Sequence, residues 1–190
     1  MRSLLLLIVV VCCSQPALAA VPDPGHSAVD PCLVVCPAGD SFFHVIVRDI
    51  VGNPIAGSTV IVDLCSCSSV VPCPGEGCAQ IGHTDASGSV TFAIKAGGVC
   101  AAGAFITADG VALGVRAVAS PDQNGDLFVD AADVAVAVGK IGGADPTADL
   151  DCDHFVTPSD VTLIGAHQGH ACDTVPTQAQ SWGHVKAIYR

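Results

Sequence analysis

The chain has 190 residues, with 18 Asp and Glu against seven Lys and Arg, which gives a formal net charge of −11. Such a surface repels nucleic acid and anionic lipid headgroups, so the composition argues against both as partners. Only 4% of the residues are aromatic, so a hydrophobic core would have to be built mainly from Val, Ala, Ile and Leu.

The N-terminus has the features of a secretory signal peptide. Arg2 precedes an apolar run from residue 4 to residue 11, and small residues around Ala20 predict the cleavage site. This run is too short to span a bilayer, as is every later apolar stretch, so we expect a secreted protein without membrane insertion. We assign residues 1–20 to the signal peptide and residues 21–30, which carry Pro and Asp, to a leader.

Residues 31–119 show the pattern of short antiparallel strands. Apolar residues alternate with polar ones or form short runs, and clusters of Gly, Pro, Asn and Asp separate them. The predicted strands are 41–48, 59–64, 90–94, 104–107 and 111–118. This spacing is typical of an antiparallel β-sandwich.

Nine cysteines follow the signal peptide, and in an exported chain they predict disulfides. They are Cys32, Cys36, Cys65, Cys67, Cys73, Cys78, Cys100, Cys152 and Cys172. Residues 65–80 hold four of them and are interpreted as a disulfide-pinned loop rather than a zinc knuckle. Cys152 and Cys172 both lie in the acidic C-terminal region and are predicted to pair with each other. The other seven are an odd number, so at least one is free or pairs outside the chain, and their connectivity stays open.

Three motifs in the strand region point to a known class of domain. A strand ends in Asp at residues 45–49, a Gly-Asn-Pro turn follows at 52–57, and a Thr-Asp-Ala-Ser-Gly turn opens the strand within 84–92. Over residues 28–119 the chain resembles the bacterial immunoglobulin-like domains of surface adhesins. The resemblance implies an immunoglobulin-like antiparallel β-sandwich that acts in adhesion. The cysteine-rich insert at 65–80 departs from the usual pattern.

Two acidic loops near the C-terminus share one spacing. Each puts an oxygen-bearing side chain at positions 1, 3, 5, 9 and 12 of a loop that wraps around one hard cation. The first set is Asp122, Asn124, Asp126, Asp130 and Asp133, and the second is Asp149, Asp151, Asp153, Thr157 and Asp160. Calcium fits better than magnesium because many protein oxygens in a flexible loop suit the larger ion.

Each loop leads into apolar residues at helical spacing. The first helix is predicted to follow Asp130 and to end at Gly142, and Gly165 and Gly169 limit the second. So small a unit buries little apolar surface, so we expect bound metal and the Cys152–Cys172 link to supply much of its stability.

Residues 120–173 resemble a dockerin, in which duplicated EF-hand-like calcium loops are each followed by one helix. The resemblance implies two calcium sites, with the side chains above as ligands and the carbonyl oxygens of Phe128 and Phe155 added to them. It also implies that Val129 and Val156, at loop position 8, face inward and join the two loops by backbone pairing.

Two loop positions depart from the dockerin pattern. Position 6 normally holds Gly because the backbone there needs a positive φ, and here it holds Leu127 and His154. Such a conformation costs on the order of 1 kcal/mol at a residue with a side chain. Positions 10 and 11, which help to select the partner of a dockerin, hold Ala131-Ala132 and Pro158-Ser159 instead of the usual hydroxyl pair. A cohesin-type partner is therefore not expected.

The rest of the chain carries no catalytic motif. There is no nucleophile elbow, glycine-rich phosphate loop or HExxH motif, so we expect a protein that is not an enzyme. The spacing of His167, His170 and Cys172 is typical of a transition-metal site, which needs a thiolate. Because Cys172 is expected to be oxidised, an exposed helix end is the preferred interpretation.

The tail at residues 174–190 holds apolar and basic residues together. Its residues at helical spacing are Trp182, Val185, Ile188 and Tyr189. They predict either a docking tag for a partner or a tail that folds back onto the sandwich.

These features together predict a mostly β protein with a small α unit, in which an immunoglobulin-like sandwich is joined to a dockerin-like module. We expect an extracellular or cell-surface, non-enzymatic, calcium-binding protein that serves adhesion or assembly through a protein partner or self-association. One alternative is a self-assembling extracellular fibre subunit, in which the leader or tail completes the sheet of a neighbour. Another is an accessory module that binds polysaccharide.

Overall fold

The computed structural model describes residues 20–172, which form a mostly β structure with two short helices. The tail residues Trp182, Val185, Ile188 and Tyr189 lie outside this range, as do residues 1–19 of the predicted signal peptide. The strands are β1 Ala28–Val29, β2 Leu33–Val34, β3 Phe43–Ile46, β4 Thr59–Asp63, β5 Val71–Pro72, β6 Ala79–His83, β7 Ser89–Phe92, β8 Ala96–Gly97, β9 Cys100–Ala108 and β10 Val111–Ala119. The helices are α1 Ala131–Val138 and α2 Pro158–Ala166.

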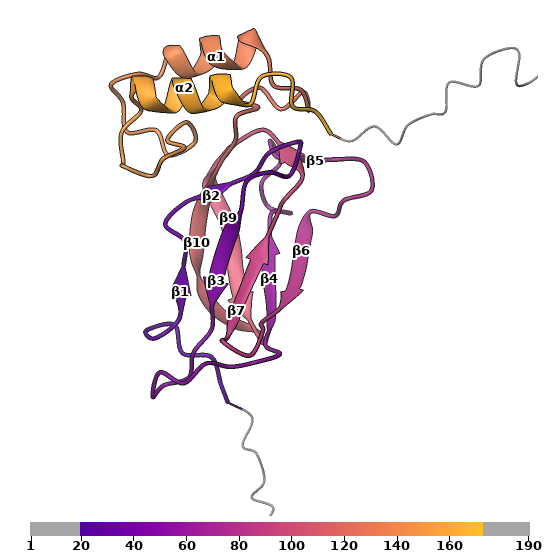
Figure 1. Cartoon of the computed structure of the whole chain (residues 1–190), viewed down its shortest axis with the longest axis vertical. Coiled ribbons are helices and arrows are strands. Elements are labelled where there is room, and N and C mark those ends of the chain that lie inside the picture. Colours follow the sequence, from indigo (N-terminus) through magenta and orange to yellow (C-terminus); the bar gives the residue numbers. More distant parts are fainter. Residues whose placement is uncertain (1–19, 173–190) are drawn as a thin grey trace, which may run out of the picture.

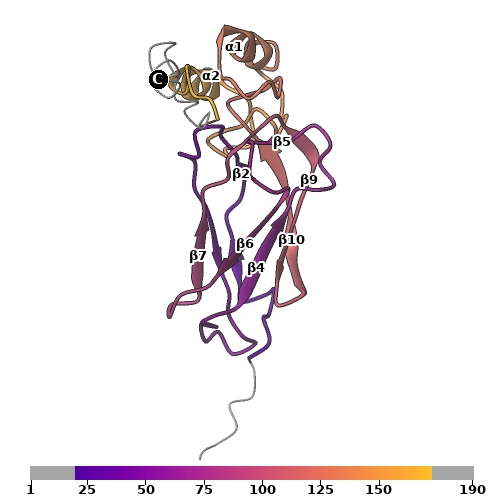
Figure 2. The ribbon, with the colours of Figure 1, turned by 90° about the vertical axis from the view of Figure 1, so that its right-hand side faces the viewer.

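The strands form two main sheets and a small third one. One sheet has the order β1-β3-β7, the other has the order β2-β10-β9-β4-β6, and β5 pairs with β8. All of these pairings are antiparallel except that of β2 with β10. In Figure 2, β7 of the first sheet lies at the left and β10 of the second at the right. The two helices lie together beyond one end of the sheets (Figure 1).

One hydrophobic core lies between the two main sheets. Phe43 and Val45 of β3 face Val60 and Val62 of β4 and Ile106 of β9 within it, and all five are almost completely buried. The alternation of buried and exposed residues along β3 and β4 puts every second side chain into this core, as period-2 patterning requires. The expectation of a mostly β chain is therefore confirmed.

The sequence prediction missed the edge strand β6. Residues 65–80 were expected to form a loop, but β5 lies within them and β6 begins at Ala79. β6 pairs with β4 along five positions, with Ile81 opposite Ile61. Along β6, half-buried Gln80 and Gly82 alternate with exposed residues that include Ile81, so the strand lacks the alternation of apolar inward and polar outward residues that marks a strand in sequence.

Four disulfides form, and they correct one prediction. The pairs are Cys32–Cys152, Cys65–Cys78, Cys67–Cys100 and Cys73–Cys172. The predicted Cys152–Cys172 pair is wrong, because the module packs against the sheets and each of its cysteines meets a cysteine of the sheet region instead. Cys65–Cys78 does pin the cysteine-rich segment. Among the described residues Cys36 is the free cysteine, and it is buried.

The disulfide content is compatible with a protein of an oxidising, extracellular compartment. Within residues 20–172, neither helix has the length and apolar character needed to cross a membrane.

Candidate metal centre in the paired acidic loops

In the first acidic loop, backbone N–H groups hold the carboxylates of positions 1 and 12. Asp122 Oδ1 accepts from the N–H of Gly125 at 2.7 Å, and its Oδ2 accepts from Leu127 at 2.8 Å. Asp133 Oδ1 accepts from Gln123 at 2.8 Å, and its Oδ2 accepts from Asp130 at 2.8 Å. Both Asp122 and Asp133 are fully buried. The loop thus folds around its own acids.

The second loop repeats three of these four bonds, while Asp149 Oδ1 accepts from the N–H of Asp153, at position 5, at 3.2 Å. Asp149 Oδ2 accepts from the N–H of His154 at 2.8 Å. Asp160 Oδ1 accepts from Leu150 at 2.8 Å, and Asp160 Oδ2 accepts from Thr157 at 2.8 Å. These are the same loop positions as in the first loop, so two segments with different sequences adopt one local fold. The duplication seen in the sequence is also a duplication in structure.

The loop backbone takes the left-handed conformation expected at position 6. Leu127 has φ of 69° and His154 has φ of 76°. Position 4 is also left-handed, with Gly125 at 77° in the first loop and Cys152 at 64° in the second. Three non-glycine residues therefore hold a conformation that costs each of them on the order of 1 kcal/mol, which the rest of the loop must offset.

Positions 9 and 12 also begin the helices. Asp130 caps α1 by accepting from the N–H of Ala132 at 2.6 Å, and Thr157 caps α2 by accepting from Ser159 at 3.1 Å. Together with the acid three residues later, each of them forms a capping box. This reciprocal bonding fixes where each helix starts and holds the position-12 carboxylate against the loop.

In the second loop, three acids converge. Carboxylate oxygens of Asp149, Asp151 and Asp153 all lie within 4.8 Å of one another. The equivalent residues of the first loop are Asp122, Asn124 and Asp126, where Asn124 Nδ2 donates to Asp126 Oδ2 at 3.1 Å. Phe128 and Phe155 expose their side chains, so their predicted contribution would come from the main-chain carbonyl alone.

The position-8 valines pair differently from the prediction. Val129 and Val156 are buried, as expected, but they do not bond to each other. Val129 exchanges backbone hydrogen bonds with the chain after α2, accepting from Gly169 at 2.9 Å and donating to His170 at 2.9 Å. Val156 bonds in the same way to residues 142–143 after α1, with both distances 2.8 Å. Each loop is thus closed by the segment that leaves the opposite helix.

The charge of this region is largely unbalanced. Lys140 is the only Lys or Arg between Asp122 and Asp160, and its Nζ pairs with Asp145 Oδ2 at 3.2 Å, an acid that belongs to neither loop. Burial raises the pKa of Asp122, and repulsion from Asp133 adds to this effect, although two backbone N–H groups oppose it. A carboxylate in this environment is stabilised by a cation.

Asp160 is in a different electrostatic situation. Burial disfavours its charged form, but the N–H groups of Thr157, Leu150 and Asp151 outweigh that effect and hold the pKa of Asp160 below its ordinary value. The position-12 carboxylate of the second loop is therefore ionised and in place to act as a ligand.

The first loop rests directly on β8. The N–H of Gly98 donates to the carbonyl of Asp122 at 2.9 Å. Gly97 lies so close to the Asp122 carboxylate that a Cβ at Gly97 would collide with Oδ2. The absence of a side chain at Gly97 thus makes room for the first acidic residue of the loop.

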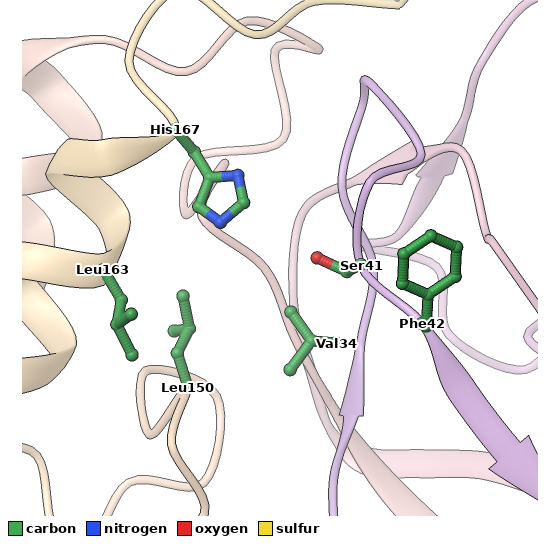
Figure 3. Close-up of a pocket in the computed structure, with 6 residues that line it drawn as sticks. All are labelled: Val34, Ser41, Phe42, Leu150, Leu163 and His167. Atoms are coloured by element: carbon green, nitrogen blue, oxygen red, sulfur yellow. The ribbon is translucent and has the colours of Figure 1, made fainter.

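A pocket of about 230 Å³ lies where the module meets the sheet region. On one side are Val34, Ser41 and Phe42, and on the other are Leu150, Leu163 and His167 (Figure 3). Beside it lies a second group of ligand-type side chains that the sequence analysis missed, formed by Cys36, Asp40, His167 and His170. Only the pair His167 and His170 had a recognisable spacing, and its partner in sequence, Cys172, is bonded to Cys73.

Comparisons with protein-family models, curated proteins and solved structures gave no match for this chain. Inference about its function therefore rests on its own sequence and geometry.

Proposed function

We propose that this chain is an exported, non-enzymatic, calcium-binding structural protein that serves adhesion or assembly at the bacterial surface or in an extracellular matrix. The observation that carries the proposal is the repeated loop geometry. In both loops the buried acids at positions 1 and 12 accept hydrogen bonds from the same loop positions. An unstructured acidic linker would not be expected to form the same internal hydrogen bonds to its carboxylates in two separate segments.

The donor set of the loops suits calcium. Every proposed ligand atom is a carboxylate, amide, hydroxyl or carbonyl oxygen, which are the donors that a hard cation prefers. The convergence of Asp149, Asp151 and Asp153 within 4.8 Å fits a cation held between them. A bound cation would neutralise acids that otherwise repel each other at close range. Calcium binding would therefore stabilise the fold of the module.

The proposal includes a class for each of the two parts of the chain. The two-sheet region acts as an immunoglobulin-like domain, and the loop–helix repeat acts as a dockerin-like module. In support, Asp49 accepts hydrogen bonds from the backbone N–H of Asn53 at 2.8 Å and from its side chain at 3.1 Å, which makes the Gly-Asn-Pro turn a compact capped turn. Val129 and Val156 each exchange two backbone hydrogen bonds with the segment that leaves the opposite helix, which supports a module built from two equal halves.

The module serves as a fixed part of the molecule rather than as a swinging docking arm. Two disulfides join it to the sheet region, one from Cys152 and one from Cys172. Gly97 and Gly98 also contact the first loop directly. Calcium would then stabilise the end of the sheet region as well as the module itself.

The outward face of the five-stranded sheet is the surface we propose for a protein partner. Phe105 and Val115 are opposite each other on β9 and β10, and they are 52% and 44% exposed. Ile81, on β6 of the same sheet, is 64% exposed. Apolar side chains at this exposure suit contact with another protein.

The second candidate is a self-assembling fibre subunit, which the edge position of β6 favours. Within residues 20–172, β6 pairs on one side, with β4, and its other backbone edge could pair with a strand of a second copy. Cross-linking through Cys36 is not part of this candidate, because that thiol is buried.

Calcium titration of the full chain tests the metal part of the proposal. We expect calorimetry to give two calcium ions per chain, and Asp122→Ala and Asp149→Ala each to remove one. Magnesium at the same concentration should bind more weakly. Asp23→Ala is the matched control, since the Asp23 carboxylate bonds to His26, three residues away and outside both loops. Calcium binding that is unchanged in both loop variants would refute the proposal.

Three assays separate the roles. Calcium-dependent retention on immobilised extracellular matrix proteins, weakened by Phe105→Ser, supports adhesion. Filaments of the purified chain in electron microscopy, absent when Ile81 is changed to Pro, support the fibre candidate. Retention on insoluble polysaccharide, without retention on matrix proteins and without filaments, would contradict both the adhesion role and the fibre candidate.

A further inference from the structure

Four side chains that commonly bind transition metals converge at the joint between the sheet region and the module. They are Cys36, Asp40, His167 and His170, called here the Cys36 tetrad. Cys36 and Asp40 lie between β2 and β3, whereas His167 caps the C-terminus of α2 and His170 follows it. One ligand atom from each residue lies within 4.8 Å of all the others. None of these residues belongs to the acidic loops.

The separations match the edges of a small tetrahedron. Cys36 Sγ lies 3.8 Å from His167 Nδ1 and 3.7 Å from His170 Nδ1. The two Nδ1 atoms are 3.1 Å apart. Asp40 Oδ2 lies 3.4 Å from His167 Nδ1 and 3.2 Å from His170 Nδ1. Tetrahedral zinc with ordinary bond lengths gives about 3.6 Å for a sulfur–nitrogen edge and about 3.4 Å for nitrogen–nitrogen and nitrogen–oxygen edges.

Hydrogen bonding alone does not account for this convergence. An imidazole nitrogen has one in-plane N–H or one lone pair, so it makes one good hydrogen bond. Yet His167 Nδ1 faces three polar atoms at short range, and His170 Nδ1 does the same. Ion pairing of both rings with Asp40 would place two positive charges 3.1 Å apart. A single cation at the centre instead uses one lone pair from each residue.

Both halves of the tetrad are tight turns held in place by the fold. Gly39 has φ of 72°, and its N–H donates to the Cys36 carbonyl at 2.9 Å, which brings Asp40 back beside Cys36. Gly169 has φ of 88°, and the His170 N–H donates to His167 at 3.0 Å. In each turn a left-handed glycine directly precedes the second ligand.

Neighbouring bonds fix the two turns against each other. The Cys36 N–H donates to Ile94 at 3.2 Å, and the His170 carbonyl accepts from Val129 at 2.9 Å. Two residues beyond His170, Cys172 is bonded to Cys73 of the sheet region. The tetrad is therefore set up by contacts that do not depend on a metal.

We propose that the Cys36 tetrad binds one Zn²⁺ in a closed, structural site. One thiolate and one carboxylate balance the charge of the ion, and four protein ligands fill its preferred tetrahedral geometry. The mixed sulfur, nitrogen and oxygen donors suit zinc and not the calcium of the acidic loops. In an exported chain the ion would also keep Cys36 reduced while the other cysteines of residues 20–172 are paired.

The zinc site would join the sheet region to the end of α2. It therefore predicts a third cross-link at this joint beside the disulfides of Cys152 and Cys172. It stands independently of the calcium proposal, because the ligands are different residues.

Metal titration of the full chain, with its disulfides intact and calcium in excess, tests the proposal. Excess calcium occupies the acidic loops, so added zinc reports on the tetrad. We expect one Zn²⁺ per chain. With Co²⁺ as a spectroscopic probe we expect a thiolate-to-cobalt charge-transfer band and intense visible bands typical of tetrahedral coordination. Zinc should displace the cobalt and remove both signals.

Variants identify the ligands. Cys36→Ser should remove the charge-transfer band, and His167→Ala or His170→Ala should each weaken zinc binding by more than the ~100-fold that loss of an outer-shell partner costs. His83→Ala is the matched control, an exposed histidine on β6. The histidine ligands are partly exposed, so their variants should fold, and an unchanged circular dichroism spectrum checks that each variant is folded.

Three results would overturn the site. Cobalt could bind without a thiolate band, zinc affinity could be the same in the histidine variants as in the natural chain, or mass spectrometry could show Cys36 oxidised in the folded protein. A different transition metal found at one per chain in the protein as purified would overturn the assignment to zinc.

Discussion

Cys152, at position 4 of the second acidic loop, is bonded to Cys32 beside β2, with 6.0 Å between their Cα atoms. The bond closes 120 residues of sequence and anchors the loop directly to the sheet region. It also lies at a residue with a positive φ of 64°. The conformation of the second acidic loop and the attachment of the module thus depend on one residue.

Removal of the Cys32–Cys152 disulfide should lower the stability of the protein more than removal of a disulfide that closes a short loop. We expect Cys32→Ser with Cys152→Ser to lower the free energy of unfolding by about 2–5 kcal/mol, because the bond restricts a long stretch of the unfolded chain. The Cys65→Ser, Cys78→Ser pair closes only 13 residues and should cost less. Denaturant unfolding with calcium present measures both. An equal or larger loss for the local pair would contradict this ranking.

Gly97→Ala should weaken calcium binding at the site proposed in the first loop. An added methyl group would collide with the Asp122 carboxylate, so the first loop must shift and its calcium affinity should fall at least about tenfold, the equivalent of 1.4 kcal/mol. Gly165→Ala in α2 is the control, because a Cβ there meets no other atom and should stabilise the helix slightly. Calorimetric titration compares the two. A normal first site in Gly97→Ala would show that the contact is unimportant.

Lys140→Met should destabilise the module. Its Nζ donates to Gln123 Oε1 and to Thr147 Oγ1, both at 2.9 Å, and pairs with Asp145. Loss of these bonds leaves a buried amide oxygen without its donor, which costs about 1–3 kcal/mol. Thermal unfolding at saturating calcium measures the change. A variant as stable as the natural chain would mean that water replaces the ammonium group at no cost.

The turn that opens β7 gives a prediction about pH. Hydrogen bonds from the Ser87 hydroxyl, the Ser89 N–H and the Ser87 N–H hold the pKa of Asp85 below its ordinary value. The ionised carboxylate therefore stabilises the turn above the ordinary pKa of Asp, and this contribution is lost as the pH falls through the lowered pKa. Ser87→Ala should raise the pKa of Asp85 in an NMR titration, whereas Ser66→Ala should not.

The sequence could predict those parts of the site whose geometry is local. The acids at positions 1 and 12 bond within a single loop, so their spacing alone indicated the fold that Asp122 and Asp133 adopt. The positive φ of Leu127 and His154 followed from the same pattern. The core strands were also visible, because β3 and β4 alternate between core and surface.

The disulfide partners and the Cys36 tetrad could not be predicted, because both depend on contacts between residues far apart in the sequence. The partners of Cys152 and Cys172 are set by how the module packs on the sheets, and no spacing records that packing. The Cys36 tetrad joins residues 131 positions apart, such as Cys36 and His167. The only local sign of it was the pair of histidines in one turn, which lacked a thiolate until the fold supplied Cys36.

The most direct test of the calcium account is the melting temperature of the full chain with calcium and with a chelator. Calcium should raise it strongly, because binding to the folded state alone stabilises that state. Asp122→Ala combined with Asp149→Ala should abolish the difference, while Asp23→Ala should retain it. A natural chain that melts at the same temperature with and without chelator, or a double variant that still responds, would contradict the account.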